Sequence, residues 1–150
     1  RLDERIEGLS GEIEELAKRD PGCARLMSVP GIGPIISSAM VAAIGTGDGF
    51  SKGRDFAAWL GLVPRQNSTG GKTRLGRTSR QGNAYLRRLL VIGAQSALFC
   101  SKATKANPWI QALLAKRPRL VVAVALANKM ARIAWALMAR QTTYQAAAVA

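Results

Sequence analysis

The sequence predicts an all-α fold, and three observations support this. Apolar residues recur at helical spacing in several segments, Pro and Gly separate those segments, and no segment shows the alternation typical of a strand. The chain has 150 residues, of which 48% are hydrophobic, so it can bury one core. We expect a coiled-coil helix over residues 1–20, a compact helical domain over 21–140 and a fraying tail over 141–150.

The N-terminal segment is predicted to be a helix with a heptad-like stripe, formed by Leu2, Ile6, Leu9, Ile13 and Leu16. Such spacing is typical of a coiled coil. We therefore expect the end of a longer coiled coil that joins protomers into a homo-oligomer. The alternative is a helix that packs on its own domain. Because the sequence begins inside the stripe without a cap, it is interpreted as part of a longer chain.

Residues 23–45 are predicted to form two short helices joined by the turn VPGIG. Pro34 suits the first turn of the second helix, since its missing N–H would be unpaired there anyway. Gly31, Ile32 and Gly33 in the turn resemble the core of a helix-hairpin-helix motif, whose backbone amides point at a nucleic-acid phosphate. The alternative is a tight helical corner in which the glycines serve packing alone.

The next predicted helix covers residues 52–61. Ser51 is expected to cap it, and Phe56, Trp59 and Leu60 form an apolar face that we expect in the core.

Three further helices are predicted towards the C-terminus. Asn83 is expected to cap a helix that ends near residue 100, and Asn107 a short helix over 107–116. The Arg117-Pro118 pair should end the latter, so that a last helix covers 119–140. The predicted inward positions of the first of the three are Leu86, Leu89, Leu90, Ile92 and Gly93.

Between these helices, residues 64–82 are rich in glycine and polar side chains, which predicts a long loop without a regular element. The stretch PRQNSTGGKTRLGR contains two hydroxyls, Ser68 and Thr69. Gly70 and Gly71 would let backbone amides approach a phosphate. The surrounding cations, which could neutralise charge on that phosphate, are Arg65, Lys72, Arg74 and Arg77.

The charge balance predicts an anionic partner, nucleic acid before any other. Net charge is +13, and the acidic residues gather in the first twenty positions; none follows Asp55. The chain contains no histidine, which excludes a Ser-His-Asp triad. Residues 56–150 offer no carboxylate or histidine as metal ligand or acid–base pair, so no metal site is expected in this chain.

We also expect no membrane partner and a cytoplasmic location. The longest apolar run is interrupted by Asn128, Lys129 and Arg132, and no secretory signal is visible. Cys23 and Cys100 lie in apolar contexts without metal-ligand spacing, which predicts two buried free thiols.

Three consecutive blocks carry a family resemblance: LMSVPGIGPIISSAMVAAIG, DFAAWLGLVPRQNSTGGKTRLGR and SRQGNAYLRRLLVIGAQSAL. In order and spacing they resemble the C-terminal domain of the bridge-RNA-guided insertion-sequence transposases of bacteria. The resemblance implies DNA and a guide RNA as partners. It also implies a serine that attacks DNA to form a phosphoserine link, and a separate RuvC-like DEDD domain that binds Mg²⁺. Since that domain is absent from the sequence, the chain alone is expected to be inactive.

The resemblance selects Ser68 as nucleophile, with Thr69 as the alternative and Ser79 as an outsider. Arg65 is expected at the reacting phosphate. Two other interpretations stay open: a non-catalytic helix-hairpin-helix module that binds DNA or RNA, and a structural RNA-binding protein of the translation machinery. The predicted nucleic-acid-binding residues are Gly31, Ile32, Gly33, Gly70, Gly71, Lys72, Arg74, Arg77, Arg80, Arg87 and Arg88.

Overall fold

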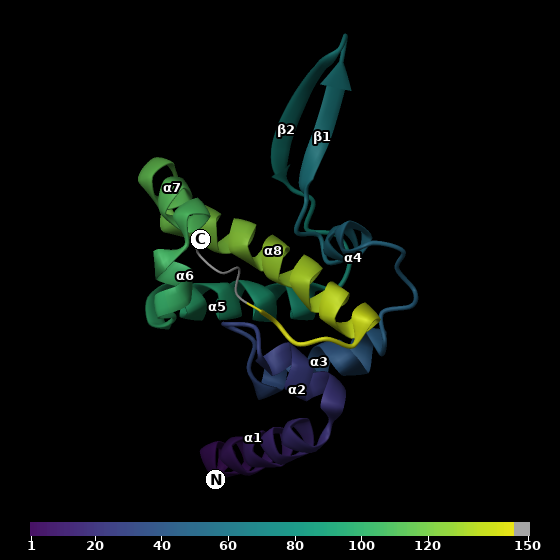
Figure 1. Cartoon of the computed structure of the whole chain (residues 1–150), viewed down its shortest axis with the longest axis vertical. Helices are drawn as coiled ribbons and strands as arrows, with labels where there is room; N and C mark the ends of the chain where they lie inside the picture. The colour runs from purple at the N-terminus through teal and green to yellow at the C-terminus, as the bar shows by residue number, and fades with distance from the viewer. Residues whose placement is uncertain (146–150) are drawn as a thin grey trace.

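The computed structural model describes residues 1–145, which form a helical body from which a two-stranded ribbon projects (Figure 1). The part of the predicted tail from 146 to 150 lies outside the described residues. The mostly helical prediction is confirmed, whereas the prediction that no strand would occur is wrong. The elements are α1 (Leu2–Arg19), α2 (Pro21–Met27), α3 (Pro34–Ile44), α4 (Gly53–Trp59), β1 (Pro64–Thr69), β2 (Lys72–Thr78), α5 (Ala84–Cys100), α6 (Lys102–Ala106), α7 (Pro108–Lys116) and α8 (Arg119–Arg140).

Local capping chemistry sets most helix boundaries where the sequence predicts them. The side chain of Asn83 accepts a hydrogen bond from the Leu86 N–H at the start of α5, and Asn107 caps α7 in the same way. The predicted Ser51 cap is wrong. Lys52 holds the N-cap position of α4, while the Ser51 hydroxyl donates to Asp55 Oδ2 over 2.7 Å.

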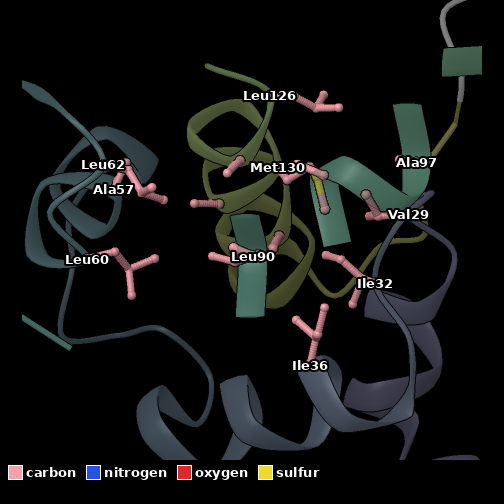
Figure 2. Close-up of a cluster of buried hydrophobic side chains, with 14 of the residues drawn as sticks. Val29, Ile32, Ile36, Ala57, Leu60, Leu62, Leu90, Ala97, Leu126 and Met130 are labelled. Atoms are coloured by element: carbon pink, nitrogen blue, oxygen red, sulfur yellow. The ribbon is translucent and has the colours of Figure 1, made fainter. Parts of the chain in front are cut away.

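The core is organised around α8, which packs against α2, α4, α5 and α7. Figure 2 shows Leu126 and Met130 of α8 near Leu90 of α5, with Leu60 and Leu62 from the segment after α4 on one side. By length and composition alone α8 could cross a membrane. Many of its apolar residues are buried between the other helices, and this packing accounts for its composition.

Some predicted core positions are corrected by the packing of neighbouring elements. Leu86, Leu90 and Gly93 are buried, as the pattern predicts, but Ile92 is 50% exposed on the outer side of α5. Trp59 is only partly buried: its indole stacks on Phe56, with ring centroids 6.1 Å apart, and 38% of the residue remains exposed. The short helix α6 was not expected from the sequence.

Helix α1 packs against α2 and α3 through its C-terminal part, where Ala17 is the buried residue. Leu2, Ile6, Leu9 and Leu16 of the predicted stripe are each more than half exposed. Their stripe therefore has no partner among residues 1–145, and the coiled coil stays a prediction.

The two cysteines differ in environment, so the prediction that both are buried is wrong for one. Cys23 is a buried residue of α2, and burial raises the pKa of its thiol. Cys100 is exposed at the last residue of α5, where the helix leaves the core. Neither forms a disulfide.

Candidate nucleic-acid interface

The segment predicted as a loop is a β-hairpin. Strand β1 pairs antiparallel with β2, and the Thr69–Lys72 pair closes a two-residue turn made by Gly70 and Gly71. Their φ angles are 58° and 77°, values that glycine adopts without strain and that a type I′ hairpin turn requires. The TGGK sequence was the signal for this hairpin. It was missed because both strands are polar on both faces.

The register gives the hairpin two different faces, since side chains alternate along a strand and paired residues share a face. Asn67 pairs with Arg74, and Thr69 pairs with Lys72. Arg65 follows the same alternation along β1. We call the surface formed by Arg65, Asn67, Thr69, Lys72 and Arg74 the cationic face.

Between the turn and the register shift, the other face presents Gln66 and Leu75, which form a cross-strand pair, together with Thr73. The backbone of Ser68 pairs with that of Thr73. The register shifts between Pro64 and Gln66, which bends the ribbon near its base. The cations are thus concentrated on one side of the hairpin.

The hairpin has no core of its own. Leu75 is 69% exposed, and each strand contacts only the other among the elements of residues 1–145. An isolated two-stranded hairpin is only marginally stable in water. The exposed polar surface of the ribbon is therefore free to meet a partner from outside the body.

The base of the hairpin, in contrast, is fixed to the body. Arg87 Nη1 donates to the carbonyls of Leu60 and Gln81, over 3.0 and 3.1 Å. These carbonyls precede β1 and follow β2. Asn128 of α8 donates to the Leu62 carbonyl over 3.1 Å. Nη1 of Arg87 therefore joins the two segments that lead into and out of the ribbon.

Three further predicted basic residues lie at or near the base of the ribbon. Arg77 belongs to β2, beyond the register shift, Arg80 follows β2, and Arg88 is on α5; all three are exposed. Arg80 has a φ of 54° and donates its backbone N–H to the Gly61 carbonyl. The Arg65 side chain reaches back to the Ser79 carbonyl at 3.5 Å, a long and weak contact.

The helix hairpin of α2 and α3 uses two of its three predicted residues for packing. A Cβ on Gly31 would lie 2.4 Å from the Gly93 carbonyl oxygen, so this glycine permits close approach to α5. Ile32 is 4% exposed and belongs to the core. Gly33 is the N-cap of α3, and the space beside it is open. Gly31 and Gly33 are both partly exposed, whereas Ile32 is buried, so contact of this motif with a phosphate stays a prediction.

The ribbon carries the Thr69 hydroxyl and several cations, and the next question is whether carboxylates or metal ligands accompany them. No group of three His, Cys, Asp or Glu side chains that could hold a metal ion occurs within residues 1–145. The carboxylates of Asp48 and Asp55 accept hydrogen bonds from Thr46 and Ser51.

The fold and the site define a small, strongly basic helical domain that presents a polar β-ribbon with one cationic face. Residues 23–112 match the family described as transposase IS116/IS110/IS902 family. The chain belongs to this family.

Curated relatives are similar over nearly the whole chain. A probable family 20 transposase of Pseudomonas aeruginosa is 51% identical over 146 residues, which is 96% of this chain and 43% of that protein. The transposase for insertion sequence element IS1111A of Coxiella burnetii is 40% identical, over 97% of this chain and 41% of its own length. The chain thus spans about two-fifths of the length of these relatives.

Proposed function

We propose that this chain is the DNA-contacting, nucleophile-bearing part of an insertion-sequence transposase, and that the ribbon presents the nucleophile. The observation that carries the proposal is the ribbon itself: Thr69 pairs with Lys72 on the cationic face of an exposed hairpin with a fixed base, and Ser68 precedes it in the same strand. Exposure leaves room for a DNA strand, and the cations are suited to a phosphodiester.

In the proposed reaction the hydroxyl oxygen of Ser68, or alternatively of Thr69, attacks the phosphorus of a DNA phosphodiester. A serine–phosphate ester bond forms, and the bond from phosphorus to one sugar oxygen breaks. The hydroxyl proton passes to a carboxylate base outside this chain, and the departing sugar oxygen takes up a proton from water. Charge that builds on the non-bridging oxygens is stabilised by Arg65 and by the other cations of the ribbon.

The register bears on the choice between the two hydroxyls. Thr69 lies on the cationic face, opposite Lys72, so its hydroxyl is beside the charge that the transition state needs. Serine is the less hindered nucleophile. We keep Ser68 as the first candidate from the motif and Thr69 as the alternative that the strand alternation supports.

The rest of the proposed machinery lies outside this chain. A RuvC-like DEDD domain would hold Mg²⁺ with its carboxylates, since no metal-binding group of side chains occurs within residues 1–145. A guide RNA would select the DNA sequence, and α1 would join protomers through its exposed stripe. We expect the chain alone to bind DNA without cleaving it.

The experiment combines the full-length protein, its guide RNA and a suicide DNA substrate, and looks for a protein–DNA adduct that survives denaturation. Ser68→Ala should abolish the adduct, and mass spectrometry of the Gln66–Lys72 peptide should place the phosphate on residue 68. If the phosphate is on residue 69, Thr69 is the nucleophile. Thr73→Ala is the matched control on the facing strand and should keep the adduct. An adduct that persists in both Ser68→Ala and Thr69→Ala contradicts the site.

A second candidate function is a DNA- or RNA-binding module without chemistry. The absence of a group of three possible metal ligands within residues 1–145 is compatible with it. The same experiment separates the two, since this candidate predicts salt-dependent binding without an adduct.

A further inference from the structure

The corner of the body formed by α6, α7 and the start of α8 lies away from the ribbon and from the helix hairpin (Figure 1). Its exposed side chains form a second basic surface. Helix α6 contacts α5 and α7, and α7 contacts α8, so these elements meet at one place. Their exposed cations are Lys102, Lys105, Lys116, Arg117 and Arg119. No acidic residue follows Asp55, so no carboxylate of these elements offsets this charge.

Aromatic rings lie exposed among these cations. Phe99, near the end of α5, is 58% exposed, and the guanidinium carbon of Arg119 lies 3.7 Å from its ring centroid. Trp109 on α7 is 38% exposed, with Lys129 Nζ 4.5 Å from the centroid of its ring. Arg119 covers one face of the Phe99 ring. The exposed fraction of the ring leaves stacking surface available to a planar ligand.

This combination fits an unpaired nucleic-acid strand better than a duplex or a protein. Bases of a single strand stack on exposed aromatic rings and on guanidinium planes, while flanking lysines contact the phosphates. A duplex offers its phosphates but keeps its bases stacked on each other. An acidic protein partner would account for the lysines of this surface, but not for the exposed aromatic ring of Phe99 beside Arg119.

We propose that the α6–α8 corner binds an unpaired stretch of nucleic acid, with one base stacked on Phe99 and the strand held by Lys102 and Lys105. The proposal is independent of the ribbon and of the nucleophile that it carries. An unpaired DNA strand and an unpaired RNA loop share the required chemistry, and the binding experiment distinguishes them.

The test uses the 150-residue chain and eight-nucleotide single strands of DNA and of RNA of one sequence, with a DNA duplex as comparison. Phe99→Leu keeps an apolar side chain but removes the ring. It should weaken single-strand binding about tenfold, the scale of one base–aromatic stack, and duplex binding much less. Tyr85→Leu is the matched control, because Tyr85 is 60% exposed at the other end of α5. It should change the dissociation constant by less than about twofold.

A second readout keeps the proposal testable if a variant perturbs the fold. The chain has three tryptophans, and Trp109 is the one on α7. In nitrogen-15 NMR spectra its indole signal should shift on titration with the oligonucleotides. The lysine pair is tested by combining Lys102→Gln with Lys105→Gln, which should lower the salt slope of single-strand binding by roughly 1.

Three results would overturn the proposal: an unchanged single-strand dissociation constant in Phe99→Leu, a Trp109 signal that stays in place at saturation, or an equal shift with a polyglutamate peptide. Tighter binding of the RNA would identify an RNA loop as the source of the strand. Tighter binding of the DNA would identify a displaced DNA strand. A ribbon variant with Lys72→Gln and Arg74→Gln should retain the dependence on Phe99, and loss of that dependence would also count against a separate site.

Discussion

In the helical body, side chains from α3, α5 and α8 interlock around fully buried residues, whereas the ribbon buries nothing among the described elements. Two pairs of glycines show the difference. Gly31 and Gly93 allow two backbones to touch, while Gly70 and Gly71 allow a turn in open space. The body therefore derives its structure from mutual packing. The ribbon derives its structure from strand pairing, a turn and a fixed base, which leaves its surface free for a ligand.

The largest expected effect comes from truncating one leucine in each region. Leu90→Ala removes a fully buried side chain of α5 and should lower the free energy of unfolding by about 2–5 kcal/mol. Leu75→Ala on the ribbon, where the side chain is 69% exposed, should change it by less than about 0.5 kcal/mol. Urea denaturation followed by circular dichroism measures both. Equal losses would mean that the ribbon packs on the body.

A smaller effect separates the two kinds of glycine. Gly93→Ala places a Cβ 2.3 Å from the Gly31 carbonyl oxygen, so α5 and the turn between α2 and α3 must move apart, at a cost of about 1–3 kcal/mol of global stability. Gly70→Ala meets no atom within 4 Å, but its φ of 58° strains the turn. It should loosen the ribbon and leave the urea midpoint of the body unchanged. A large shift of that midpoint in Gly70→Ala would contradict the independence of the two regions.

The smallest effect on the body is expected from cutting the ribbon. Because little burial protects it, the ribbon should open locally and be cleaved by trypsin after Lys72 or Arg74 before α5 or α8 is attacked. The nicked chain should keep the helical circular dichroism of the intact one, with its free energy of unfolding changed by less than about 1 kcal/mol. If trypsin cleaved within α8 first, the ribbon would not be the less stable of the two regions, and the prediction would be wrong.

The elements that could be predicted from the sequence are those set by local chemistry. Asn83, Asn107 and the Arg117-Pro118 pair mark helix boundaries through their own side chains, and the structure has the boundaries there. The apolar side chain of Ile92 predicts a core position, but no neighbouring element covers that side of α5, and Ile92 is 50% exposed. The contact of Gly31 with Gly93 joins residues far apart in sequence, and no local pattern predicts it.

The sequence predicts which residues make up the candidate site, but not the hairpin on which they lie. The hydroxyls and cations of residues 64–77 were recognisable, and so was the need for acid–base groups from elsewhere. The strands could not be predicted, because apolar–polar alternation normally reveals a strand and Leu75 is the one large apolar side chain in β1 and β2. Only knowledge of the register separates Thr69, on the cationic face, from its neighbours. Arg87 is predicted to contact nucleic acid, and the structure adds that its Nη1 donates to two carbonyls at the base of the ribbon; the contact with nucleic acid stays a prediction.

Those two hydrogen bonds have a mechanical consequence. The Arg87 guanidinium links the segments at which the ribbon leaves and re-enters the body, so together with Asn128 it helps to set the angle between the ribbon and the body. A strand of six residues is about 20 Å long, and a rotation of roughly 10° at its base would move the Gly70-Gly71 tip by about 3 Å. That is the difference between a hydroxyl within reach of a phosphorus atom and one that misses it.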